Sequence, residues 1–204
     1  MEVGAVFCTN AYLEDLLLAE YDRAFDAGDP FNGVLSDIGE VVGGATPSKK
    51  NEAYYCASGI AWITPRDLSG TTDKFISHGA EDITEAGYKS CSARLMPVGS
   101  VLFKSRAPIG YVAIASGNVT TNQGFKSIIP KKEIGTAFTY YFLLRNKQRI
   151  SDMGAGTTFP EVSAKMMQNR NDCYPCIQRR GRNLKSCDVA WMHSKDLHSP
   201  CVLP

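Results

Sequence analysis

The sequence lacks the short motifs by which most enzymes are identified. It contains no Gly-x-x-x-x-Gly-Lys-Ser/Thr phosphate loop, no Gly-x-Gly-x-x-Gly fingerprint, no His-Glu-x-x-His, no Gly-x-Ser-x-Gly and no Asp-rich calcium loop. The Asn-Pro-Pro-Tyr/Phe tetrapeptide of amino-methylating enzymes and the paired acids with Glu-x-Lys of metal-dependent nucleases are also absent. Only three histidines occur, and only His78 lies in the well-patterned part. These absences favour a protein without catalytic residues, cofactor or bound metal.

Long hydrophobic runs and an excess of charge of one sign are missing as well. No window approaches the roughly 18 uncharged apolar residues that a membrane span needs, so no membrane partner is predicted. The Met1-Glu2-Val3 start lacks the basic and apolar regions of a secretory signal, which favours a cytoplasmic protein. The formal net charge is +1, from 22 Lys and Arg against 21 Asp and Glu, so nucleic-acid binding would require local clustering of bases.

Two segments carry the periodicity of helices. Asn10 has the side chain of a helix cap, and Gly28-Asp29-Pro30 would end the helix that follows it. Between them, apolar residues recur every four positions: Leu13, Leu17, Tyr21 and Phe25. An aromatic helix is predicted from about Thr136 to Ile150, with bases in its last turns that suit the negative end of the helix dipole. Ser163 is placed to cap a short later segment.

The middle of the chain has the composition of β-strands. Its runs are rich in Val, Ile and Thr and are bounded by turn residues. They cover residues 34–35, 38–42, 60–64, 100–103, 111–115 and 125–130. No helix of about a dozen residues separates one run from the next, which argues against regular βαβ alternation. The predicted fold class is therefore α+β, a β-rich domain with a short N-terminal helix and an aromatic C-terminal helix.

Four loop segments combine small polar residues with isolated bases: residues 45–50, 62–68, 105–110 and 120–126. Such side chains suit DNA reading, because Arg bonds guanine at two points, Asn and Gln bond adenine, and Ser, Thr and Lys hold phosphates. A structural interpretation is also open, in which Arg106 pairs with a carboxylate and Asn122-Gln123 holds a turn. Composition alone therefore predicts an α+β domain that is a candidate binding module.

Taken in order, these segments resemble the target-recognition domain of the specificity subunit of type I restriction–modification enzymes. A Leu35-Ser36-Asp37-Ile38 strand leads into seven motifs within residues 33–168, each weak alone but specific in this order. They are Gly43-Gly44-Ala45-Thr46-Pro47-Ser48, Trp-Ile-Thr-x-x-Asp-Leu (62–68), Ile-Thr-x-x-Gly (83–87), Pro-x-Gly-Ser-Val-Leu (97–102), Ser-Arg-Ala-Pro-Ile-Gly (105–110), Thr-Asn-Gln-Gly-Phe-Lys (121–126) and Gly-Thr-Thr-x-x-x-Val-Ser (156–163). The helix at residues 10–27 is similar to the tail of the family's conserved helix.

The resemblance implies that DNA recognition and catalysis belong to different subunits. A specificity subunit of this family has no catalytic residues and binds a split double-stranded DNA sequence through two recognition domains, which an antiparallel helix pair holds apart. The helices dock the methyltransferase (modification) subunits, and a motor-nuclease (restriction) subunit joins the assembly. This chain is accordingly expected to recognise one half of a bipartite target and to direct those subunits to it.

Residues shared across such a family are expected to shape turns: Gly43, Pro97, Gly99, Pro108 and Gly110. The bases should then be read by less stereotyped loops, at residues 48–51 and 71–74. The predicted DNA-binding residues are Ser48, Lys49, Lys50, Asn51, Thr72 and Lys74, with Arg106 and Lys126 as second choices for phosphate or base contacts.

The chain departs from the family pattern after residue 168, where the expected Glu-Glu-Gln-containing segment and second long helix are absent. The tail holds four of the seven cysteines, and an odd number without an export signal argues against a disulfide framework. One interpretation is a zinc site built from Cys173, Cys176, Cys187, His193, His198 and Cys201. The favoured interpretation is a reading-frame shift near residues 165–172, because one back-translation of residues 177–183 gives Pro-Glu-Glu-Gly-Gln-Glu in another frame.

The predicted organisation has three parts. Residues 1–30 form the end of a conserved spacer helix, residues 31–168 form the DNA target-recognition domain, and residues 169–204 form an atypical, poorly ordered tail. Without the second long helix, the helix pair cannot form within this chain. An inactive, truncated remnant that still binds DNA is therefore an alternative to a working specificity subunit.

Overall fold

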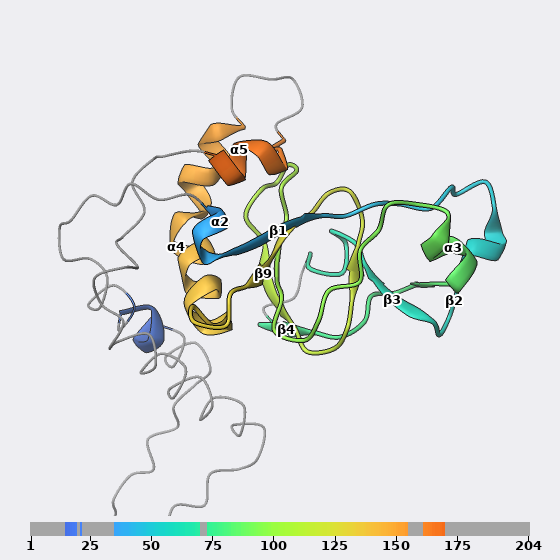
Figure 1. The fold of residues 1–204 in the computed structure, drawn as a ribbon, viewed down its shortest axis with the longest axis horizontal. Helices are drawn as coiled ribbons and strands as arrows, with labels where there is room; N and C mark the ends of the chain where they lie inside the picture. The colour runs from blue at the N-terminus through green and yellow to red at the C-terminus, as the bar shows by residue number, and fades with distance from the viewer. Residues whose placement is uncertain (1–14, 20, 22–34, 70–72, 155–160, 170–204) are drawn as a thin grey trace, which may run out of the picture.

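The computed structural model describes residues 15–19, 21, 35–69, 73–154 and 161–169 (Figure 1). Its strands form two sheets. The five-stranded sheet has the spatial order β1 (Gly39–Gly43), β9 (Lys126–Pro130), β6 (Val101–Phe103), β7 (Val112–Ala115) and β4 (Phe75–Ile76). The four-stranded sheet has the order β2 (Tyr55–Cys56), β5 (Asp82–Ile83), β3 (Ile60–Ile63) and β8 (Thr120–Thr121). The helices are α2 (Leu35–Ile38), the 3-10 helix η1 (Glu52–Tyr54), α3 (Glu85–Lys89), α4 (Thr136–Met153) and α5 (Ala164–Asn169).

Most neighbouring strands run antiparallel. In the longest pairing, between β1 and β9, Gly39 lies opposite Pro130 and Gly43 lies opposite Lys126. Among the described strands, the parallel contacts are those of β3 with β8 and of β4 with β7. Strands and helices do not alternate regularly along the chain, so the predicted α+β class is confirmed.

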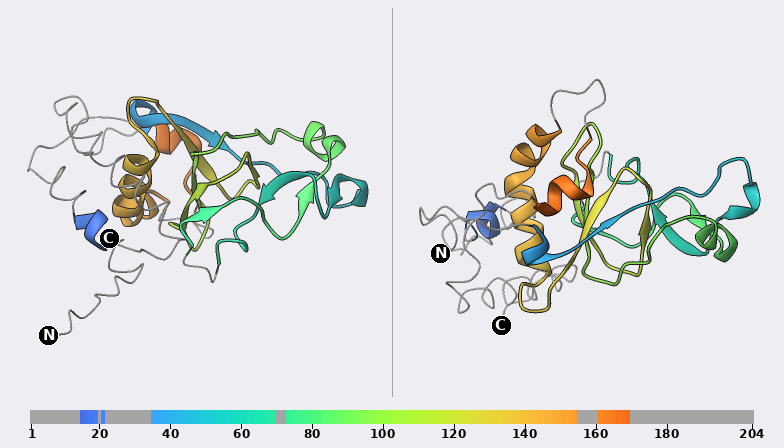
Figure 2. Two further views of the ribbon diagram at one scale, coloured as in Figure 1. Left: turned by 90° about the horizontal axis from the view of Figure 1, so that it is seen from below. Right: turned by 45° about the horizontal axis from the view of Figure 1, so that its top comes forward.

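The five-stranded sheet carries a hydrophobic cluster on each face, because successive side chains of a strand point to opposite faces. On one face Phe103 and Ile128 belong to a cluster that includes Phe138 of α4. On the other face Leu102 belongs to a cluster that includes Ile63 of β3. Helix α4 therefore covers one face of this sheet, and the second sheet lies toward the other (Figure 2).

The elements η1, β2, β3, β5 and α3 extend away from α4, and we refer to them as the distal lobe (Figures 1 and 2). Helix α3 begins at Thr84, whose Oγ1 accepts a hydrogen bond from Gly87 N at 3.1 Å and donates one to Ala53 O at 2.9 Å. A side chain at Gly87 would place its Cβ 2.4 Å from Tyr54 O. The Ile-Thr-x-x-Gly motif is thus a helix cap that also fastens α3 to η1.

The longer runs predicted as strands are confirmed as β1, β3, β6, β7 and β9. The prediction of a strand over Leu35-Ser36-Asp37-Ile38 is wrong, because Leu35–Ile38 is a single helical turn whose i, i+3 spacing buries both end residues. Helix α4 continues to Met153, beyond the predicted end at Ile150, so its bases lie before the last turn. Ser163 caps α5 as predicted, since its Oγ accepts a hydrogen bond from Met166 N at 3.1 Å.

The predicted N-terminal helix is described only at residues 15–19 and 21, which are helical. Tyr21 is 2% exposed, and its ring centroid lies 5.6 Å from that of Phe138 and 6.5 Å from that of Tyr141. This segment therefore packs on α4. The predicted cap at Asn10 and the stop at Gly28-Asp29-Pro30 lie outside the described residues. Within the described part of the chain, no helix has the length and apolar character needed to cross a membrane.

Candidate nucleic-acid interface

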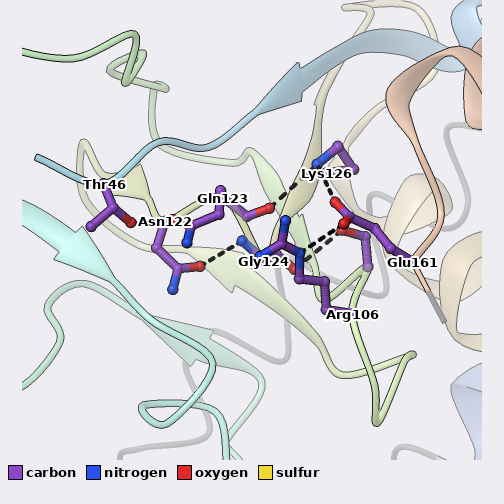
Figure 3. A network of polar contacts seen from close by, with 8 residues as sticks. Thr46, Arg106, Asn122, Gln123, Gly124, Lys126 and Glu161 are labelled. Carbon is purple, nitrogen blue, oxygen red and sulfur yellow. Dashed lines mark hydrogen bonds and ion pairs between the residues drawn. The ribbon is translucent and has the colours of Figure 1, made fainter. Parts of the chain in front are cut away.

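Segments far apart in the sequence meet at the margin between the two sheets, and we call this meeting point the motif junction (Figure 3). Ala45 N donates to Thr121 O at 2.9 Å, and Asn122 N donates to Ile63 O at 3.0 Å. Ser105 N donates to Gly124 O at 2.9 Å. Four of the seven sequence motifs are therefore joined by main-chain hydrogen bonds.

Glycine is required at this junction at one position in particular. A Cβ on Gly44 would lie 1.9 Å from Asn122 O, so no other residue fits without moving the backbone. The prediction that Gly43 shapes a turn is wrong, because Gly43 ends β1 opposite Lys126 and its added Cβ would meet only Lys126 Cδ, at 4.0 Å. The same prediction is confirmed for Gly99 and Gly110, whose φ angles of +86° and +103° suit glycine.

A carboxylate lies between two of the predicted DNA-contacting bases. Arg106 Nε is 2.9 Å from Glu161 Oε2, and Lys126 Nζ is 3.6 Å from Glu161 Oε1 (Figure 3). The side chain of Arg106 is 46% exposed, whereas that of Lys126 is only 13% exposed. The prediction that Arg106 pairs with a carboxylate is thus confirmed. No local pattern in the sequence points to Glu161 as that carboxylate. Arg106 retains access to solvent, but Lys126 is largely enclosed.

The polar residues of the 120–126 loop also bond within the protein. Asn122 Oδ1 accepts a hydrogen bond from Gly124 N at 2.8 Å, which confirms that this side chain holds a turn. Thr46 Oγ1 donates to Gln123 Oε1, and Lys126 Nζ donates to Gln123 O at 3.3 Å (Figure 3). These hydrogen bonds therefore hold the neighbouring loops of the junction in place.

The predicted residues Ser48, Lys49, Lys50 and Asn51 form an exposed turn that leads into the distal lobe, and we call it the 48–51 turn. Asn51 N donates to Ser48 O at 3.1 Å, which closes the turn. The Asn51 Oδ1 atom accepts from Ala53 N at 3.2 Å and so caps η1, while its two amide N–H donors have no acceptor among the described residues. All four residues are exposed, so their polar atoms can reach a partner.

Two aromatic residues support this turn from behind. Tyr55 OH donates to Pro47 O at 2.7 Å, and Trp62 Nε1 donates to Ala45 O at 3.1 Å. The two rings meet edge to face with centroids 5.6 Å apart, and Trp62 is only 2% exposed. The main chain that enters the turn is therefore held by two side-chain hydrogen bonds. Burial, followed by Glu81 and Cys91, raises the pKa of Tyr55, which keeps its hydroxyl a donor.

A cavity of about 540 Å³ lies beside the same aromatic residues. Its lining combines one base with two acids: Lys49, Glu52, Tyr55, Cys56, Ala57, Ala80 and Glu81. The ammonium of Lys49 lies 6.0 Å from the Tyr55 ring centroid and 5.9 Å from that of Trp62, at the outer limit of a cation–π contact. Lys49 is therefore loosely held and can turn toward a ligand.

The structure places Lys74 away from the 48–51 turn, against α4. Its Nζ donates to Tyr141 OH at 2.7 Å and lies 4.9 Å from the Tyr140 ring centroid and 4.7 Å from that of Tyr141. Thr72 lies outside the described residues. The seven predicted residues that the structure describes thus divide among the 48–51 turn, the motif junction and the α4 face. Within the described residues, no group of three or more His, Cys, Asp or Glu could hold a metal, and the Cys/His-rich tail lies outside them.

Comparisons with known proteins agree on one family. The family model described as the type I restriction modification DNA specificity domain matches residues 32–171. The chain is 45% identical over 144 residues to the type I restriction enzyme MjaIX specificity subunit of Methanocaldococcus jannaschii, covering 69% of this chain and 33% of that protein. It is 29% identical over 136 residues to the EcoR124I/EcoR124II specificity subunit of Escherichia coli, covering 65% and 32%. The chain therefore spans about a third of the length of these relatives.

Solved structures show the same fold. The HsdS subunit from Thermoanaerobacter tengcongensis aligns with a TM-score of 0.58 at 17% identity, covering 93% of this chain and 46% of that one. A chain from a structure on complex assembly and conformational transition of the type I R-M system aligns with a TM-score of 0.63 at 18% identity, covering 91% and 45%.

Proposed function

Because this chain belongs to the family of type I restriction modification DNA specificity domains, we propose that it recognises one half of a bipartite duplex DNA target. Residues 31–168 act as the target-recognition unit of a specificity subunit. The chain performs no chemistry itself, and it directs a methyltransferase subunit and a motor-nuclease subunit to the sequence that it binds. The exposed 48–51 turn, held by Tyr55 and Trp62, is the observation that carries this proposal.

The 48–51 turn has the chemistry for both parts of DNA recognition. Lys49 and Lys50 supply ammonium groups for phosphates or for the acceptors of guanine, and the Asn51 amide can donate to adenine N7 or thymine O4. A loop that is already fixed when the partner arrives loses less conformational entropy on binding. The two hydrogen bonds to Pro47 O and Ala45 O, at 2.7 and 3.1 Å, provide that pre-organisation.

The remaining predicted residues take different roles in this proposal. Arg106, which is half exposed, contacts a phosphate, and the Glu161 carboxylate competes with that phosphate for the guanidinium. Lys126 mainly secures the loop that it shares with Gln123. Lys74 anchors the segment before β4 to α4 through Tyr141, and it is a DNA contact only if that hydrogen bond is exchanged.

A triple variant of the turn tests the proposal. Lys49→Ser and Lys50→Ser remove two bases, and Asn51→Ser removes the amide while keeping a residue able to cap η1. The matched control is Lys131→Ser with Lys132→Ser, two adjacent lysines between β9 and α4. Fluorescence anisotropy with duplex DNA should show that the triple variant binds more weakly, with the salt slope reduced by up to about 0.9 for each lost lysine contact. Equal losses in both variants would mean that the turn has no special role.

A further inference from the structure

Lys104 is a buried base that the predicted site did not include. It follows β6 directly, and only 5% of the residue is exposed. Its ammonium lies 4.8 Å from the centroid of the Tyr111 ring, and burial lowers its pKa. Tyr111 itself is 38% exposed, so the ring that lies against the ammonium reaches the protein surface.

The charge of Lys104 has no counterion in the described part of the chain. Three described carboxylates pair with other bases: Arg94 pairs with Glu40, Lys89 lies 3.8 Å from Glu85, and Arg106 shares Glu161 with Lys126. No described carboxylate pairs with Lys104 Nζ, and no described acceptor forms a hydrogen bond with it. A buried ammonium that only an aromatic ring compensates costs folding free energy. An apolar side chain of similar length would pack there without that cost.

The main chain around Lys104 is firmly held. Lys104 N donates to Tyr111 O at 2.9 Å, and Gly110 N donates to Lys104 O at 3.0 Å. Lys104 also forms a β-bridge with Phe125, immediately before the Ser105-Arg106 segment of the motif junction. The main chain of Lys104 therefore lies at the same margin of the sheet as that of the half-exposed Arg106.

We propose that Lys104 and Tyr111 form an anion subsite that binds a phosphodiester of the DNA backbone. The subsite rests on the proposed DNA-binding function and adds two residues to it. A phosphate oxygen supplies the missing counter-charge to the ammonium and accepts a hydrogen bond from the Tyr111 hydroxyl, which has no described protein partner. A partly desolvated ammonium interacts more strongly with an anion than one in bulk water does.

Lys104→Met separates this role from a purely structural one, because Met keeps the aliphatic length and removes only the charge. Its midpoint of thermal unfolding should equal or exceed that of the wild type. Its affinity for duplex DNA should fall, with the salt slope reduced by about 0.9, the value for one phosphate contact. The loss should be similar for all duplex sequences, because a phosphate contact carries no direct sequence information. Lys132→Met, which alters an exposed lysine elsewhere, should keep the wild-type slope.

Tyr111→Phe is the second variant, and it tests the anion subsite if Lys104→Met folds poorly. It keeps the ring over the ammonium and removes the hydroxyl, so DNA affinity should fall about ten-fold or more, as expected for one hydrogen bond to a charged acceptor. Unchanged DNA affinity in both variants, while the wild type binds DNA, overturns the subsite alone. A wild-type chain that binds no duplex overturns the proposed function together with it. Inorganic phosphate is the second probe: if Lys104→Met loses stabilisation by phosphate but keeps its DNA slope, the ligand is a free anion and the DNA assignment is wrong.

Discussion

Arg106 Nε lies 2.9 Å from Oε2 of Glu161, and this pair joins the loop between β6 and β7 to the segment that follows α4. A main-chain hydrogen bond from Val162 N to Ser105 O, 3.0 Å long, runs alongside it. The end of the recognition fold is thereby attached to its central sheet. The same carboxylate also lies 3.6 Å from Lys126 Nζ, so Glu161 controls the net positive charge of the junction.

Glu161→Gln should increase the net positive charge of the motif junction. The Arg106–Glu161 pair is more than a third exposed on both sides, so its loss should reduce stability by only about 0–1 kcal/mol. Non-specific duplex DNA should bind more tightly, because two bases lose their competing carboxylate. Denaturant unfolding and anisotropy at several salt concentrations measure the two effects. Glu133→Gln, at an exposed acid elsewhere, is the control, and weaker DNA binding by Glu161→Gln would show that the carboxylate itself serves the interface.

Gly44→Ala should be severely destabilising, whereas Gly43→Ala should not. The added methyl group at position 44 would lie 1.9 Å from Asn122 O, a backbone atom that cannot move without breaking the main-chain contacts of the junction. The cost should be about 3 kcal/mol or more, in the range of strongly overpacked sites. At position 43 the nearest atom is 4.0 Å away, and the change should stay within about 0.5 kcal/mol. Urea midpoints compare the pair directly, and equal midpoints would contradict this account of the motif.

Tyr141→Phe tests whether Lys74 is an anchor or a DNA contact. The variant removes the hydroxyl that accepts from Lys74 Nζ at 2.7 Å and should cost roughly 0.5–1.5 kcal/mol of stability. DNA affinity should remain at the wild-type value, since α4 and the 48–51 turn are separate. A marked change in DNA affinity with unchanged stability would indicate that Lys74 contacts DNA and is not an anchor.

The lowered pKa of Lys104 predicts a particular dependence of stability on pH. Above the folded-state pKa the native protein has released the proton, while the unfolded chain keeps it up to about pH 10.4. The unfolded state then binds more protons, so stability rises with pH in this window. The free energy of unfolding of the wild type, relative to that of Lys104→Met, should therefore increase toward about pH 10. A fall in this difference between about pH 8 and 9.5 would be the contradictory result.

The sequence predicted the longer strands and α4, because Val- and Ile-rich runs and a continuous aromatic helix leave local patterns. It missed β2, β4, β5 and β8, which have two residues each and are too short for an alternating pattern. It also missed partners that are distant in the chain, such as Lys74 and Tyr141, separated by 67 positions. The exposed 48–51 turn could be predicted, since its polar composition needs no tertiary partner, whereas the buried environment of Lys104 arises only from the folded sheet.

Selection of bound duplexes from a random DNA library tests the central claim most directly, because every possible target sequence competes in one experiment. The wild-type chain should enrich one short contiguous sequence, corresponding to a single half-site. The Lys49→Ser, Lys50→Ser and Asn51→Ser variant should lose or change that sequence, and the Lys131→Ser with Lys132→Ser control should enrich the same sequence as the wild type. Failure of the folded wild-type chain to enrich any sequence, or enrichment of the same sequence by the triple variant, would contradict a recognition role for the turn.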